Sequence, residues 1–197
     1  MTREPRGFSL PEVLVSTFFL TLFSVMLYQF NRAVLRSVRL QEVRGEAQEV
    51  ARIAIDVMTR ELRLSGYGGA GVPLPRLRAA SPERVEVQAD LNGDGDTGDA
   101  SEIVTYAYDL ERETLMRATG TAPPQPMVEH VPEGNFLLRY RDDSNVLLEG
   151  ELDEATRARV RQIEIGLRVV YPNPDPAQAA PIVVTQHATV ELRNATP

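Results

Sequence analysis

Two sets of carboxylates in the sequence differ from the other acidic residues in their neighbours and spacing. Glu12 follows Phe8 by four positions and carries the only formal charge between Phe8 and Tyr28. Residues 90–102 form an acidic run that contains four Asp and one Glu. A carboxylate is costly in hydrocarbon, so an ionisable group in an apolar segment indicates a functional position. A dense group of oxygen ligands indicates a site for a hard cation such as calcium.

The first half of the acidic run has the spacing of a calcium-binding loop. Oxygen-bearing side chains occupy alternate positions from Asp90, and glycine occupies the sixth position. Asp90, Asn92 and Asp94 are therefore expected to bind calcium through their side chains. Asp96 is expected to bind through its carbonyl or its side chain.

The second half of the run departs from this motif. Ser101 occupies the twelfth position, and Glu102 comes one residue late. The flanking residues resemble strands, so we predict a bent, calcium-filled connection between two strands, with Asp99 or Glu102 completing the coordination. The alternative is a solvated hairpin tip, since Asn-Gly and Asp-Gly pairs favour turns. Repulsion among five carboxylates favours the calcium interpretation.

The apolar segment 8–28 is long enough to cross a bilayer if it is helical, at roughly 31 Å. A cleaved secretory signal has a shorter apolar region followed by a small-residue cleavage site. Residues 29–32 read Gln-Phe-Asn-Arg and offer no such site. A simple signal anchor fits the length but gives no role to Glu12.

The N-terminus resembles that of type IV pilin-like precursors with a class III, prepilin-type signal. In that family a short basic leader ends in Gly, the next residue is usually Phe, and the fifth mature residue is Glu. Gly7, Phe8 and Glu12 match position for position. The resemblance implies that a prepilin peptidase removes residues 1–7 and methylates the new amino group of Phe8. It also implies that Glu12 pairs with that amine, in its own subunit or in a neighbour, during assembly.

The arginines around the apolar segment favour the opposite orientation. Arg3 and Arg6 precede the segment, whereas four arginines follow it soon after: Arg32, Arg36, Arg39 and Arg44. The positive-inside rule alone would keep the following domain in the cytoplasm. The pilin-like motif implies instead that the leader is inside, where its peptidase acts.

Beyond Tyr28 the sequence becomes amphipathic, and apolar residues recur at three- and four-residue steps from Val43 to Leu62. This pattern predicts one helix from about Ser9 to Leu64, ended by the glycine-rich residues 65–71. We divide it into a transmembrane or assembly half, residues 8–30, and an amphipathic half, residues 31–66. The segment 60–67 resembles the helix end of the PilW-type minor pilins.

Residues 67–197 are predicted to form one globular domain. Alternating apolar residues predict strands at 84–89, 103–109, 114–117, 135–141, 160–170 and 182–193. Residues 154–161 fit either a helical turn or a charged strand. The predicted fold class is α+β: a long N-terminal helix whose amphipathic half packs on an antiparallel sheet.

Composition and missing motifs exclude several kinds of function. The net charge of −7 argues against nucleic acid as a partner, and the chain has no cysteine for a disulfide. His130 and His187 lie far apart in sequence without a metal-ligand pattern, and neither a nucleotide-binding glycine loop nor a Gly-x-Ser-x-Gly motif is present. We therefore expect that the protein is not an enzyme.

The resemblance implies a minor pilin of a type IV pilus, inserted once in the inner membrane and then carried into a pilus at the cell surface. It would help to prime assembly or form the tip. The implied partners are other minor and major pilins, the prepilin peptidase, the inner-membrane assembly platform and a tip adhesin. One alternative is a minor pseudopilin of a type II secretion system. Another is a membrane-anchored calcium-binding interaction domain that does not polymerise.

Overall fold

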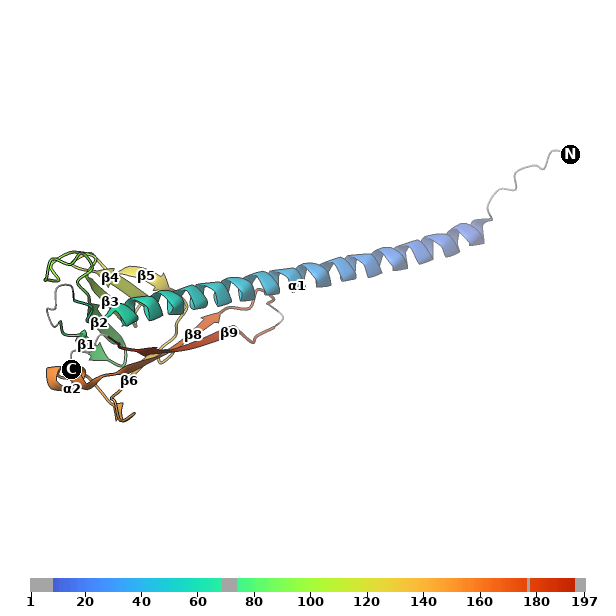
Figure 1. The fold of residues 1–197 in the computed structure, drawn as a ribbon. Coiled ribbons are helices and arrows are strands. Elements are labelled where there is room, and N and C mark those ends of the chain that lie inside the picture. Colours follow the sequence, from blue (N-terminus) through green and yellow to red (C-terminus); the bar gives the residue numbers. More distant parts are fainter. Residues whose placement is uncertain (1–8, 69–73, 177, 194–197) are drawn as a thin grey trace.

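A single long helix, α1 (Leu10–Leu64), carries the domain at its C-terminal end (Figure 1). The computed structural model describes residues 9–68, 74–176 and 178–193. Ser9 is the N-cap, and Pro11 lies in the first turn, where a missing N–H is tolerated. Gly66 ends the helix in the left-handed region at φ +72°, and its N–H donates to the Gln88 carbonyl at 2.8 Å. The predicted helix, ending at Leu64, is confirmed.

The buried part of α1 lies near its C-terminal end. Three alanines come first and larger residues follow, so the backbone is able to approach the strands closely at the alanines. Met58 and Leu62 are fully buried. The buried residues of the helix are Ala47, Ala51, Ala54, Ile55, Met58 and Leu62.

The strands form two antiparallel sheets. The first sheet has five strands in chain order: β1 (Leu77–Ser81), β2 (Arg84–Gln88), β3 (Ile103–Asp109), β4 (Thr114–Thr119) and β5 (Gln125–Val128). The second has four strands in spatial order: β7 (Leu147–Leu148), β6 (Phe136–Arg141), β8 (Gln162–Tyr171) and β9 (Ile182–Glu191).

The prediction of a single sheet was wrong, although the fold class is α+β as predicted. The six predicted strands are present within two residues of their expected ends. The pattern missed β1, β5 and β7. β1 lacks a clear apolar alternation, β7 has only two residues, and β5 contains Pro126. Pro126 is tolerated because β5 is an edge strand with one partner. Residues 154–159 form the short helix α2 (Glu154–Arg159), so the helical alternative is confirmed.

The two sheets and α1 share one hydrophobic core. The first hairpin joins the sheets: the Pro82 carbonyl accepts from the Leu138 N–H at 2.8 Å. The buried Tyr140 hydroxyl donates to the Ser81 carbonyl at 2.9 Å. Because buried polar groups need partners, these bonds fix β6 against the β1–β2 turn.

Gly120 is expected to tolerate alanine less well than Gly134. Both residues have positive φ, +53° and +75°, so alanine strains either one by about 1–2 kcal/mol. A Cβ on Gly120 would also lie 2.8 Å from Ala100 Cα, whereas nothing lies within 4 Å of one on Gly134. We expect Gly120→Ala to cost about 1–3 kcal/mol more than Gly134→Ala in urea unfolding of the full chain in detergent. Equal losses would contradict this reading of the Ala100 contact.

Candidate functional site

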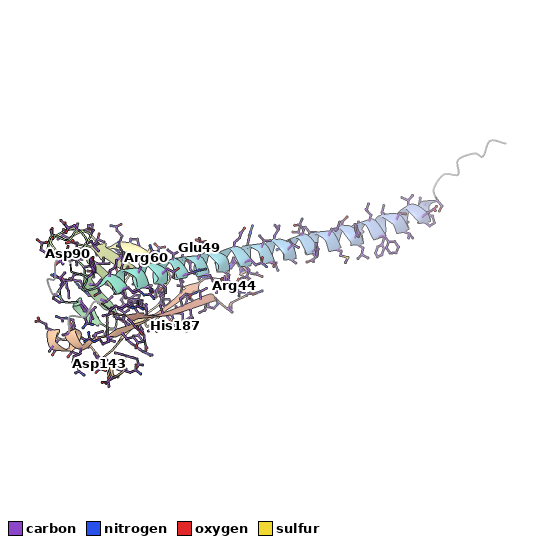
Figure 2. All side chains as sticks on the ribbon, viewed as in Figure 1. Arg44, Glu49, Arg60, Asp90, Asp143 and His187 are labelled. Carbon is purple, nitrogen blue, oxygen red and sulfur yellow. The ribbon has the colours of Figure 1, made fainter. Side chains whose placement is uncertain are left out.

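The N-terminal half of α1 is apolar and extends away from the domain (Figure 2). An 18-residue window of this helix has a mean hydropathy of 1.9, and none of that window is buried. By length and composition it is able to cross a membrane. Phe18, Phe23 and Met26 are 64%, 58% and 70% exposed. Apolar surface of this extent indicates contact with lipid or with other protein chains.

Four serine and threonine hydroxyl groups within this apolar half are satisfied by the helix itself. Ser16, Thr17, Thr21 and Ser24 each donate to a carbonyl three or four residues earlier, at 2.8–3.0 Å. These donors therefore need no partner outside the helix. Such a segment suits a bilayer and a dry helix bundle equally well.

Glu12 lies in the first turn of α1, and its carboxylate folds back over the start of the helix. The Ser9 N–H donates to Oε2 of Glu12 at 3.3 Å, and the Ser9 hydroxyl lies 3.4 Å from the same oxygen. The unpaired N–H groups of a helix N-terminus favour a carboxylate there. The carboxylate thus lies over the first turn of the helix, at Ser9. The predicted cleavage and methylation residues, Gly7 and Phe8, lie outside the described residues.

The acidic loop joins β2 to β3, so its flanks are strands. Asp90 starts the loop and is fully buried. Its Oδ1 accepts from the Gly93 N–H at 2.6 Å, and its Oδ2 accepts from the Gly95 N–H at 3.0 Å. The loop therefore folds around the Asp90 carboxylate.

Glu102 ends the loop and is also buried, with 2% of its surface exposed. Its Oε1 accepts from the Leu91 N–H at 3.0 Å, and its Oε2 lies 3.3 Å from the Asp99 N–H. Carboxylate oxygens of Asp90, Asp94 and Glu102 come within 4.8 Å of one another. Three of the six predicted ligands therefore converge. Glu102 is one of them, although it comes one residue later than the motif requires.

The other three predicted ligands make contacts within the loop. The Asn92 amide donates to Asp94 Oδ2 at 2.9 Å and to Asp99 Oδ2 at 2.6 Å. Asp96 Oδ1 accepts from the Gly98 N–H at 2.7 Å. The Asp96 N–H and the Asn92 amide lower the pKa of the Asp94 carboxyl, so this group stays ionised to a lower pH than an ordinary aspartate.

A partly buried ion pair, which we did not predict from the sequence, joins α1 to the five-stranded sheet. Arg117 Nη2 and Nε lie 2.7 and 3.1 Å from the two carboxylate oxygens of Glu61. The fully buried Tyr106 donates its hydroxyl to the same carboxylate. Burial, and then the hydrogen bond to Glu61 and the Glu61 charge, raise the pKa of Tyr106 above its ordinary value. The sequence contains one indication of this pair: the charged Glu61 lies between Met58 and Leu62, two apolar residues of the packed face of the helix.

The histidines lie apart from these groups. The His130 ring contacts Tyr171 with centroids 4.6 Å apart, and His187 pairs with Gly166 across β8 and β9. Within residues 9–68, 74–176 and 178–193, the metal-capable group found is Asp90, Asp94 and Glu102.

The structure is similar to a type IV-like pilin from Thermus thermophilus, with a TM-score of 0.49 and 12% sequence identity. The match covers 76% of this chain and 98% of that pilin. No protein-family model matches the sequence, and no curated protein matches it.

Proposed function

We propose that the protein is a minor pilin of a type IV pilus. It enters the inner membrane as a single-pass precursor and loses residues 1–7 to the prepilin peptidase. It then joins the filament through residues 8–30, where it primes assembly or forms the tip. Its partners are other minor and major pilins, the inner-membrane assembly platform and, at the tip, an adhesin.

The observation that carries this proposal is the position of Glu12 on an exposed apolar helix. Its carboxylate folds back onto Ser9, next to the residue that would become the new N-terminus. An amine at Phe8 would therefore lie beside the carboxylate of its own chain or of a neighbouring chain. A charge pair with hydrogen bonds is tolerated in apolar surroundings, whereas a lone charge is not. Such a pair would set the register of one helix against the next.

Mass spectrometry of the N-terminal peptide tests the processing step. Protein recovered from its native host is expected to begin at Phe8 with a methylated amino group. A Gly7→Val variant is expected to retain residues 1–7, and Thr2→Ala, within the leader, is the matched control that is still cut. Wild-type protein that begins at Met1 or Thr2 would contradict the proposal and favour a membrane-anchored domain that does not polymerise.

A type II secretion pseudopilin has the same apolar helix and the same processing, so phenotype separates the two functions. Deletion of the gene is expected to reduce the number of surface pili and to leave protein secretion intact. The reverse result would identify a minor pseudopilin.

We also propose that the acidic loop binds calcium. The convergence of three carboxylates, two of them buried, supports this proposal. Asp90, Asp94 and Glu102 would supply the charge, with further oxygens from Asn92, Asp96 and Asp99. An ion that binds only the folded loop stabilises the fold by mass action, by about 2.7 kcal/mol at 100 times its dissociation constant.

Calorimetry and thermal melting of the full chain in detergent test the calcium proposal. Wild type is expected to release or absorb heat on calcium addition and to melt at a higher temperature. Asp94→Asn, at an exposed ligand, is expected to weaken binding roughly 10- to 100-fold. Glu149→Gln/Glu151→Gln, exposed and outside the loop, is the control and should bind as wild type does. No heat and no melting shift for wild type would refute calcium binding.

A further inference from the structure

Three arginines follow the apolar half of α1 on one face of the helix. At about 100° per residue, Arg36 and Arg39 lie about 40° and 20° to either side of Arg32 around the axis. Val50, which is half-buried against the domain, lies on the same stripe five turns further along. The arginines therefore extend the packed face of the helix toward its apolar half.

A hollow of about 230 Å³ lies between these arginines and the connection from β8 to β9. Figure 1 shows the β8–β9 hairpin alongside α1. The connection between the two strands lies at the end of the hairpin that is nearer the N-terminal half of the helix. The lining of the hollow contains three cations and one carboxylate: Arg32, Arg36, Arg39, Pro174, Asp175 and Pro176. The lining therefore has an excess of positive charge.

The arginines lack acidic partners in the part of the chain that the structure describes. All three are exposed. The Arg32 guanidinium lies over the Tyr28 ring, 5.7 Å from its centroid, and no ion pair joins any of the three to a described carboxylate. Guanidinium groups present paired N–H donors that match the oxygens of a phosphate.

The position of the hollow along the helix selects the source of that phosphate. The transmembrane or assembly half of the helix ends at Phe30, and Arg32 and Arg36 come about 3 and 9 Å further along the axis. Lipid headgroups occupy about 5–7 Å beyond each side of the hydrocarbon core. Helical side chains point toward the N-terminus, which here is the direction of the membrane. The guanidinium groups of Arg32 and Arg36 therefore reach the level of the lipid phosphates.

We propose that this hollow binds the phosphate headgroup of an anionic phospholipid, in the leaflet through which α1 leaves the membrane. The proposal rests on the proposed membrane insertion. It also gives the arginines a role on the side of the membrane where the positive-inside rule does not favour them. Lipid phosphate compensates their charge while the subunit is in the bilayer.

Lipid-selective quenching in reconstituted vesicles tests the proposal. The chain has no tryptophan, so Phe30→Trp places a single reporter at the end of the apolar segment. The full chain is reconstituted in mixtures of phosphatidylglycerol and phosphatidylcholine, with one or the other brominated. Brominated phosphatidylglycerol is expected to quench the tryptophan fluorescence more than its mole fraction in the vesicle predicts. This preference for the anionic lipid should fall about fivefold per arginine lost at low ionic strength.

The test variant is Arg32→Gln/Arg36→Gln/Arg39→Gln, and the charge-matched control is Arg44→Gln/Arg52→Gln/Arg60→Gln, on exposed positions outside the hollow. The preference should disappear in the first and persist in the second. Inorganic phosphate at matched ionic strength should leave it unchanged. Loss of preference on phosphate addition would overturn the choice of a lipid.

Some results would overturn the headgroup site alone, and another would overturn membrane insertion as well. Equal quenching by both lipids, or an anionic preference that survives in the test variant, would overturn the headgroup site and leave insertion intact. A methylated Phe8 found together with that result would leave the pilin proposal standing. Absence of quenching by either lipid would overturn the membrane insertion on which both proposals rest.

Discussion

Glu12→Ala is expected to leave the chain in the membrane but to exclude it from sheared filaments. Glu12 is the only charge in the apolar segment, and its carboxylate accepts from the Ser9 N–H at the start of the helix. Without it, the amine at Phe8 would enter a helix bundle unpaired. Breaking a buried pair in this way costs about 3–5 kcal/mol, which corresponds to a loss of incorporation of more than about 100-fold. Immunoblots of membrane and sheared fractions measure both quantities.

Two further variants separate charge from shape at this position. Glu12→Gln keeps the size and the hydrogen bonds to Ser9 but removes the charge, so it should fail as alanine does. Ser16→Ala removes a hydroxyl that the helix already satisfies, so it should incorporate normally. Filaments that contain Glu12→Ala at wild-type levels would refute the charge pair, whatever the result for glutamine.

Glu61→Ala is expected to destabilise the domain by about 2–4 kcal/mol. The substitution removes the acceptor of the buried Tyr106 hydroxyl and leaves the half-buried Arg117 without its ion pair. Because this pair joins α1 to the five-stranded sheet, the loss should affect the whole domain. Urea unfolding of the full chain in detergent, followed by the near-ultraviolet circular dichroism of the tyrosines, measures it.

The matched control is Asp56→Ala on the same helix. Asp56 makes an exposed pair with Arg52 at 3.8 Å, and exposed pairs of this kind contribute about 0–1 kcal/mol. Tyr106→Phe keeps the ion pair and should cost about 1 kcal/mol, so it isolates the hydroxyl. If Glu61→Ala unfolds at the same urea concentration as Asp56→Ala, the ion pair does not hold the helix to the sheet.

The elements that depend on local pattern could be predicted from the sequence. α1 follows from its apolar periodicity and the glycines after Leu64, and the long strands β8 and β9 follow from alternation. The division into two sheets could not be predicted, because β6 pairs with β8 and not with the preceding strand β5, and the local pattern of β6 does not reveal this choice. β5 was missed because it contains Pro126, which a strand tolerates only at a sheet edge, and the sequence does not show that β5 is an edge strand.

The same distinction between local patterns and distant contacts applies to the functional residues. Glu12 is recognisable because its neighbours in sequence are apolar, and the acidic loop is recognisable because its ligands are close in sequence. The pair of Glu61 and Arg117 joins residues 56 positions apart, so no local spacing indicates it. The hollow beside Arg36 forms only when the connection between β8 and β9 returns to the helix.

The lengthwise contact between α1 and the sheets determines how the domain responds to mechanical load. A pull along the helix axis acts on the contacts from Ala47 to Leu62 in shear, so they share the tension and must yield together. A sideways pull would instead peel them apart one after another. The domain is therefore attached most strongly along the direction in which its N-terminal helix would be pulled.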